Sequence, residues 1–272
     1  MACVLSARPR AELAPFVRAY AQRTVGPTES AWTQYVPAQL EQIINFEFGV
    51  LPGIRHRDRE ISQIILLGGA QTAYAGSLHL RPGVESFAIF FSPAGWSLLF
   101  HIPVKETTNQ FDDATPFHGA SIRELWNRMG EEVLFQRRVA LVEQFLMQRL
   151  PAVSLQSPVT MAANYLFRNN GAVRIPRLSR QSALSLRHFE RLFRADFGMP
   201  PKVFARVARF QAAMDAKLAD PTKTWLEIAH SSGYYDQMHM IHDFELLGRN
   251  TPTQVLLQMG DVRPAALASA ME

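Results

Sequence analysis

Three arginines recur on one side of a predicted helix in the C-terminal half of this 272-residue chain. Arg187, Arg191 and Arg194 lie at positions i, i+4 and i+7, which places them on one helical face. A guanidinium group can donate two hydrogen bonds to O6 and N7 of guanine, and it also binds phosphate. His188 neighbours this face and adds a further group that can contact a base or a phosphate. The pattern favours contact with a nucleic acid in its major groove.

The opposite side of the same helix is apolar, and a second basic helix precedes it. The apolar residues at core spacing are Leu186, Phe189, Leu192, Phe193 and Phe197. The preceding helix, predicted over 176–183, contributes Arg177 and Arg180. We expect these two arginines to bind phosphates together with Arg194 and Lys202. Two helices joined by a short turn are typical of a helix-turn-helix, whose second helix enters the major groove.

A second copy of this arrangement lies further along the chain, over 228–254. One amphipathic helix ends near Ile228, Gly233 supplies the turn, and a second helix is predicted from Tyr235 to Leu246. The residues of this helix that we expect to face DNA are Tyr235, Gln237, His239 and His242. A glutamine can pair with adenine through two hydrogen bonds, and histidines can contact phosphate.

Acidic residues distinguish the second unit from the first. They are Asp236, Asp243 and Glu245. Because carboxylates repel the phosphates of DNA, we expect the second unit to bind DNA more weakly than the first. Part of its surface is then available to a protein partner.

A long helix is predicted between the two units, over 202–219. Its eighteen residues span roughly 27 Å at about 1.5 Å per residue. Successive major grooves on one side of DNA are about 34 Å apart. A rigid helix of this length therefore predicts that the two units contact adjacent turns of one duplex.

Charge is distributed unevenly along the chain, although the net charge is only +4. Residues 159–209 contain ten basic and two acidic side chains. In contrast, residues 1–156 contain fourteen basic and fourteen acidic side chains, and residues 210–262 contain three basic and seven acidic ones. The basic block indicates a polyanionic partner, namely double-stranded DNA. Two alternatives remain at this point: an arginine-rich face with no partner, and an ordinary helical bundle.

The N-terminal half has a mixed pattern, so the chain is predicted to be of the α+β class. Strand-like runs are found at 40–48, 63–67 and 85–91, and helices are predicted at 95–101, 121–129 and 133–150. The last of these helices either forms a homodimer contact or packs on its own domain. The predicted organisation is a sensory or dimerisation domain over 1–152, a linker over 153–158, a helical domain over 159–262 and a flexible tail over 263–272.

The C-terminal segments resemble the AraC/XylS family of bacterial transcription regulators. The matching sequences are LSLRHFERLFRADFGMPPKVFARVARFQAAM (184–214) and IAHSSGYYDQMHMIHDFELLGRNTPTQVL (228–256). The resemblance implies a DNA-binding domain of seven helices with two helix-turn-helix units, which usually activates transcription near a promoter and therefore has RNA polymerase as a partner. This chain departs from the family pattern at Ala183, where glycine is common, and at Met238, Met240 and Glu245.

The N-terminal half resembles, more loosely, a sensory domain that precedes this DNA-binding unit in some members of the family. The matching sequences are VPAQLEQIINFEFG (36–49), LLGGAQT (66–72) and FFSPAGWSLLFHIPV (90–104). The resemblance implies a small β-rich domain followed by helices, and it fixes no effector. Aromatic residues that could line a small-molecule pocket are Phe46, Phe48, Phe87, Phe90 and Trp96, although aromatics at strand spacing more often form plain core.

Residue patterns for catalysis are missing from the sequence, so we expect no enzymatic activity and no cofactor. There is no P-loop, dinucleotide fingerprint or nucleophile elbow, and Cys3 has no activating partner. His79 and Glu85 are six residues apart, but no second histidine accompanies them, so we expect no metal site.

Short apolar runs, the lack of a signal region and the single cysteine favour a cytoplasmic protein without a membrane partner. The sequence as a whole predicts a DNA-binding regulator that responds to an unknown small-molecule effector, and we expect it to be an activator. The alternative is a modulator that binds another regulator or RNA polymerase without contacting DNA bases.

Overall fold

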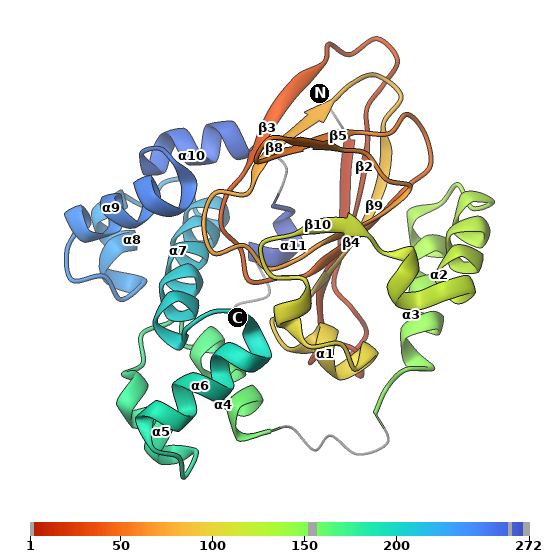
Figure 1. Cartoon of the computed structure of the whole chain (residues 1–272). Coiled ribbons are helices and arrows are strands. Elements are labelled where there is room, and N and C mark those ends of the chain that lie inside the picture. Colours follow the sequence, from red (N-terminus) through yellow and green to blue (C-terminus); the bar gives the residue numbers. More distant parts are fainter. Residues whose placement is uncertain (1–2, 152–156, 261–262, 269–272) are drawn as a thin grey trace.

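A computed structural model describes residues 3–151, 157–260 and 263–268 (Figure 1). A β-rich N-terminal domain with flanking helices is followed by a helical C-terminal domain, which confirms the predicted α+β class. The predicted linker over 153–158 lies mostly outside the described residues, and at its end Ser157 and Pro158 already begin a helix. Within the described part of the chain, no helix is long and apolar enough to cross a membrane.

The N-terminal domain contains two antiparallel sheets. One sheet has the strand order β1 (Cys3–Ala7), β2 (Val17–Thr24), β9 (Glu85–Phe91), β4 (Ile43–Glu47), β7 (Ile65–Gly68) and β10 (Phe111–Asp113). The other has the order β3 (Trp32–Val36), β8 (Gly76–Leu80), β5 (Gly53–His56) and β6 (Arg59–Ile61). Strands β9, β4 and β7 correspond to the three predicted runs, and β9 matches its predicted bounds.

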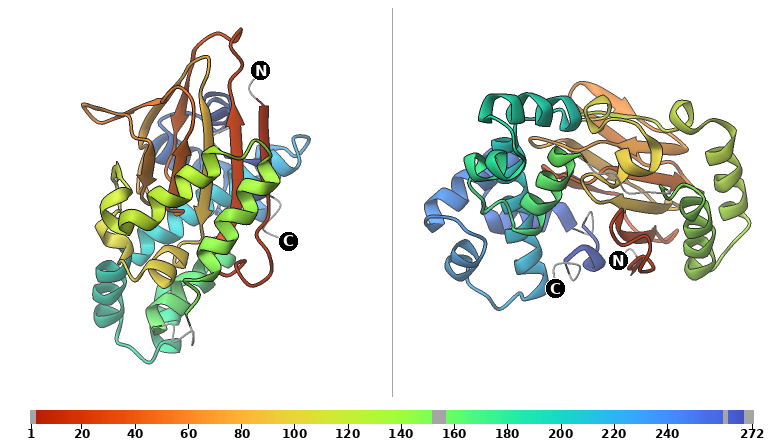
Figure 2. Two further views of the ribbon diagram at one scale, coloured as in Figure 1. Left: turned by 90° about the vertical axis from the view of Figure 1, so that its right-hand side faces the viewer. Right: turned by 90° about the horizontal axis from the view of Figure 1, so that it is seen from below.

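Alternation along β9 gives the six-stranded sheet two different faces. Phe87, Ile89 and Phe91 point to one side and join a core with three helices, because successive side chains of a strand face opposite ways. These helices are α1 (Gly95–Phe100), α2 (Thr115–Gly130) and α3 (Phe135–Met147). The other side, with Ala88 and Phe90, lines a cavity together with residues of the four-stranded sheet. Figure 2 shows the helices packed beside the strands.

The C-terminal domain contains the seven helices that the resemblance implies, within its described residues. They are α4 (Pro158–Arg168), α5 (Ile175–Gln181), α6 (Leu186–Phe197), α7 (Pro201–Ala219), α8 (Trp225–Ser231), α9 (Gln237–Gly248) and α10 (Pro252–Met259). Helix α7 is the predicted spacer helix and begins one residue earlier, because proline is well suited to the first turn of a helix. The two predicted helix-turn-helix units are α5–α6 and α8–α9.

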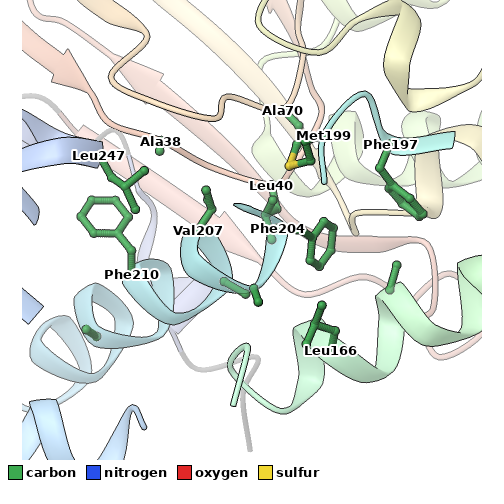
Figure 3. Close-up of a cluster of buried hydrophobic side chains, with 14 of the residues drawn as sticks. Ala38, Leu40, Ala70, Leu166, Phe197, Met199, Phe204, Val207, Phe210 and Leu247 are labelled. Carbon is green, nitrogen blue, oxygen red and sulfur yellow. The ribbon is translucent and has the colours of Figure 1, made fainter. Parts of the chain in front are cut away.

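One hydrophobic cluster extends across both domains. Ala38, Leu40 and Ala70 of the N-terminal domain belong to the same buried cluster as Phe204 and Phe210 of α7 (Figure 3). A short 3-10 helix, η1 (Val104–Glu106), also packs against α6. The position of the helical domain is therefore fixed by direct packing in addition to the chain connection.

The end of the described chain differs from the flexible tail predicted over 263–272. Ala265–Ala268 form a short helix, α11, that packs on β2 and α7. Leu267 is completely buried and Arg263 is 7% exposed. The interpretation of this segment as small and polar predicts fraying. Instead, Ala266 and Leu267 fit an apolar sheet face and Arg263 meets buried carboxylates, which only the tertiary structure brings together.

Candidate DNA interface and ligand cavity

Helix α6 combines a buried aromatic side with an exposed basic side, as the sequence predicts. Its N-cap, Ser185, accepts a hydrogen bond from the backbone nitrogen of His188 at 3.3 Å. Phe189, Phe193 and Phe197 are buried, and Phe193 and Phe197 contact the ring of Phe204 on α7 edge-on. This packing fixes the rotation of α6 and so determines which residues face outward.

All the basic residues predicted for the first unit lie on the surface. The exposed residues are Arg177, Arg180, Arg187, His188, Arg191, Arg194 and Lys202. Arg191 and His188 are brought together, with Nη2 of the arginine 3.2 Å from Nε2 of the histidine. Among the described residues, no carboxylate lies within 4 Å of the charged nitrogens of Arg187, Arg191 or Arg194. Their hydrogen-bond donors are therefore available to an external anion.

The second unit has the same construction with different residues. Thr224 and Glu227 form a capping box at the start of α8, and Gly233 in the turn has a φ of 77°. Asp236 caps α9 by accepting a hydrogen bond from the backbone nitrogen of His239 at 2.7 Å. Of the predicted contacts, Tyr235, His239 and His242 are exposed and Gln237 is partly buried.

Of the three carboxylates of the second unit, Asp236 and Glu245 lie on the surface, as the sequence suggested, and Asp243 does not. Asp243 is fully buried, and its Oδ1 lies 2.5 Å from Nε of Arg206 on α7. The carboxylate of Asp236 is used by the cap. Glu245 is exposed and lies 3.5 Å from His242. The prediction for Asp243 was wrong because its partner is 37 residues away, which local periodicity does not reveal.

The structure also adds residues that sequence analysis did not place at this surface. Met238 and Leu246 of α9 are 58% and 51% exposed. The outer side of α9 therefore combines histidines with apolar side chains, in contrast to the arginines of α6. The spacing of Met238 and Leu246 along the helix could have revealed their exposure.

Both recognition helices, α6 and α9, are held at their C-terminal ends by the N-terminal domain. Thr108 Oγ1 donates a hydrogen bond to the carbonyl of Phe197 at 3.1 Å. The backbone nitrogen of Ala38 donates to the carbonyl of Leu247 at 3.0 Å. Gly198 follows α6 with a φ of 69°, and a Cβ there would lie 2.7 Å from Thr108 Oγ1. Both recognition helices are thus in direct contact with the N-terminal domain.

A buried cluster of four charges also joins the domains. Arg263 contacts Asp215 of α7 through two hydrogen bonds of 2.5 and 2.8 Å, and Arg18 of β2 pairs with Glu41. Burial alone would raise the pKa of Glu41, but Arg263 and Arg18 hold this pKa at about 2. Gln211 of α7 adds a hydrogen bond of 2.5 Å to Glu41. The cluster is neutral overall, which makes its burial tolerable.

A cavity of about 90 Å³ lies between the two sheets. One end is polar, with Arg23, Asn45, Glu47 and Ser86, and the rest is mainly apolar. Burial raises the pKa of Glu47 to about 8, against a hydrogen bond from Ser86 and the charge of Arg23. Glu47 is therefore mostly uncharged at neutral pH and can donate a hydrogen bond to a ligand.

Of the five aromatic residues considered for a pocket, Phe90 lines this cavity. Phe46, Phe87 and Trp96 belong to the core on the helix-covered side of the sheet, and Phe48 stacks on Trp126. Strand alternation explains the difference, since the side chains of Phe87 and Phe90 point to opposite faces. The expectation that these four residues line a pocket was therefore wrong: they belong to the core or pack against it.

The two residues weighed as metal ligands have other partners. His79 is 3.0 Å from Thr33 and 3.3 Å from Ser77, whereas Glu85 pairs with Arg138 of α3 at 2.5 Å. In the part of the chain that the structure describes, no group of three or more His, Cys, Asp or Glu residues could hold a metal ion.

Comparison with known proteins agrees with this architecture. Residues 178–258 match the family model described as a helix-turn-helix domain. No curated protein matches the chain significantly. Among solved structures, ToxT from Vibrio cholerae O395 is 10% identical, with 95% of this chain and 97% of that chain covered and a TM-score of 0.50. A substituted apo form from strain SCE256 is 9% identical, with 93% and 100% covered and a TM-score of 0.53.

A third similar structure is wild-type ToxT from Vibrio cholerae strain SCE256 with a bound unsaturated fatty acid. It is 8% identical, with 95% of each chain covered and a TM-score of 0.50. At these identities the similarity concerns the fold: a β-rich domain followed by a helical one, extending over nearly the whole of both proteins.

Proposed function

We propose that this chain, whose C-terminal part is an AraC-type helix-turn-helix domain behind a β-rich domain, is a sequence-specific DNA-binding transcription regulator. The observation that carries the proposal is the row of exposed arginines on α6, which form no ion pair with a carboxylate among the described residues. This helix is held at its C-terminal end and presents its N-terminal residues outward, which is how recognition helices contact base edges.

The contacts with DNA divide into two kinds. Arg187, His188 and Arg191 contact base edges in the major groove, with a smaller contribution from Gln237 and His239. Phosphates are bound by Arg177, Arg180, Arg194 and Lys202, and at the second unit by Tyr235 and His242. The first unit therefore supplies most of the sequence preference.

The cavity between the sheets is the proposed effector site. It offers an apolar lining and a polar end with Arg23, Asn45 and the uncharged Glu47. These groups suit an amphiphilic molecule with an acidic or hydrogen-bonding head. The similar protein ToxT has been crystallised with an unsaturated fatty acid, which supports the same class of ligand here.

The remaining properties follow from the family type. We propose a cytoplasmic bacterial protein that activates transcription together with RNA polymerase and has no catalytic activity. The apolar side chains of Val133 and Leu134, immediately before α3, are exposed, which supports a homodimer contact at the start of this helix.

Selection of random duplexes by the purified protein at two salt concentrations tests the proposal. A bipartite motif with half-sites one helical turn apart, and binding that weakens steeply with salt, is the expected result. A single short motif would restrict base contacts to the first unit. No enrichment at either salt concentration would favour the modulator, for which exposed Met238 and Leu246 provide an apolar contact surface.

A further inference from the structure

The inner face of the six-stranded sheet is divided into three rows by the pairing of β2, β9 and β4. In order along the sheet, these rows are Arg23–Ser86–Glu47, Ala21–Ala88–Asn45 and Ala19–Phe90–Ile43. The first row is polar and the last is apolar. The face therefore changes from hydrogen-bonding to apolar character over four residues of each strand, which suits an amphiphilic ligand.

Helix α11 covers the apolar row. Ala266 and Leu267 form one buried cluster with Ala19, Ile43 and Phe90. Pro264, just before this helix, lines the cavity itself. The cavity of about 90 Å³ is small beside the roughly 300–1,000 Å³ of most ligand sites. The C-terminal segment thus occupies the space into which the cavity would otherwise extend.

The same segment is bound to the DNA-binding domain. Arg18 Nη2 donates a hydrogen bond to the carbonyl of Leu267 at 3.0 Å. Arg263 is paired with Asp215 in the middle of the buried charge cluster, and Asp215 belongs to α7, the helix between the two helix-turn-helix units. Withdrawal of this segment would leave two buried carboxylates, Asp215 and Glu41, with one arginine between them.

We propose that the space filled by Ala266 and Leu267 is a second compartment of the effector cavity, which the apolar chain of an amphiphilic ligand occupies by displacing α11. This inference rests on the proposed function. The ligand head lies at Arg23 and Glu47, and its chain runs past Ala88 to Ile43 and Phe90. Ligand and α11 are mutually exclusive there.

Displacement couples the ligand to DNA binding. When α11 leaves, Arg263 is withdrawn from Asp215 and the contact between α7 and the N-terminal domain weakens. Because coupling between two sites is reciprocal, any substitution that loosens α11 also raises the affinity for a long-chain ligand. The competition costs the ligand at least the burial of one leucine, which alone corresponds to about tenfold or more in affinity, and the loss of the Arg263–Asp215 pair adds to this cost.

Calorimetric titration of the full chain with cis-9-octadecenoic acid and with hexanoic acid tests this inference. Leu267→Asp destabilises α11 in its site, and Leu257→Asp is the matched control because Leu257 is 70% exposed on α10. We expect the long acid to bind Leu267→Asp at least about tenfold more tightly than the wild type. Hexanoic acid binds both equally, and the control behaves like the wild type.

Hydrogen exchange on the unsubstituted protein gives a second readout that does not depend on a variant. The long acid should accelerate exchange of the amides of 266–268, whereas hexanoic acid should not. Binding of the long acid without faster exchange, or equal affinity for Leu267→Asp and the wild type, would overturn the displacement and leave the effector proposal intact. If neither acid binds any variant, the proposed ligand class fails and the second compartment with it.

Discussion

The two helix-turn-helix units have closely similar backbones and different surfaces. Each turn contains a residue with positive φ, 54° at Ala183 and 77° at Gly233. Each recognition helix begins at a side-chain cap, Ser185 or Asp236. The outer side of α6 carries arginines, whereas that of α9 combines histidines with Met238 and Leu246. Turn, cap and core residues therefore determine the geometry, and the exposed residues can vary independently of it.

A second difference lies in how the recognition helices are joined to α7. Helix α6 packs on Phe204 of α7 through the rings of Phe193 and Phe197. Helix α9 adds an ion pair between buried Asp243 and partly exposed Arg206 to the contact of Phe244 with Phe210. The second unit is thus positioned partly by charge, and the first by apolar packing. This contrast leads to the following predictions, from the largest expected effect to the smallest.

Loss of the buried carboxylate should affect the second unit strongly. Asp243→Ala leaves Arg206 without its partner, and we expect the free energy of unfolding to fall by about 2–3 kcal/mol. This is less than the roughly 3–5 kcal/mol typical of fully buried pairs, because the Arg206 side chain is 43% exposed. The matched control is Asp196→Ala on α6, a half-buried carboxylate that we expect to change stability by less than about 0.5 kcal/mol. Urea denaturation measures the free energy of unfolding of both variants. Equal losses in the two variants would contradict a special contribution of the Asp243–Arg206 ion pair.

Replacement of a base-contacting arginine should separate the two units in DNA binding. Arg191→Ala is expected to cost roughly 1–3 kcal/mol and to relax the preference at one base pair. Gln237→Ala should cost less than about 1 kcal/mol, because Gln237 is partly buried and its unit is the weaker one. Affinities for every single-base variant of the selected duplex measure these effects.

Arg194→Ala serves as the control for that experiment. Because Arg194 is assigned to a phosphate, its replacement by alanine should lower the affinity for all sequences equally. An equal loss on every sequence with Arg191→Ala as well would contradict its assignment to a base edge.

The two turns allow reciprocal substitutions. Gly233→Ala should destabilise the protein by about 1–2 kcal/mol, because an L residue is strained at positive φ, and its Cβ would also lie 3.0 Å from that of Ala172. Ala183→Gly should stabilise it by up to about 1 kcal/mol, since the relief of strain is partly offset by the greater freedom of glycine in the unfolded chain. Thermal denaturation of the two variants should show shifts of opposite sign; shifts of the same sign would refute the equivalence of the turns.

Sequence patterns predicted the elements whose signals are local. Strand β9 and helix α7 follow from periodicity and from residues within one turn. The arginine side of α6 was likewise predictable, because the aromatic residues on its other side fix the rotation of the helix.

Features that depend on distant partners were not predictable. Asp243 is internal because of Arg206, and α11 is ordered because Arg263 meets Asp215 and Glu41. Strands β4 and β9 carry apolar side chains on both faces, so alternation did not reveal which of their aromatic residues line the cavity. In each case the deciding contact lies far away in the sequence.

Footprinting of the selected duplex with hydroxyl radicals and with a major-groove methylation probe tests the central claim most directly. We expect two protected segments about ten base pairs apart, with Arg191→Ala weakening the protection of the segment bound by the first unit more than that of the other. A single protected segment, or loss of both segments with Arg191→Ala, would contradict the account of two unequal units that bind one duplex.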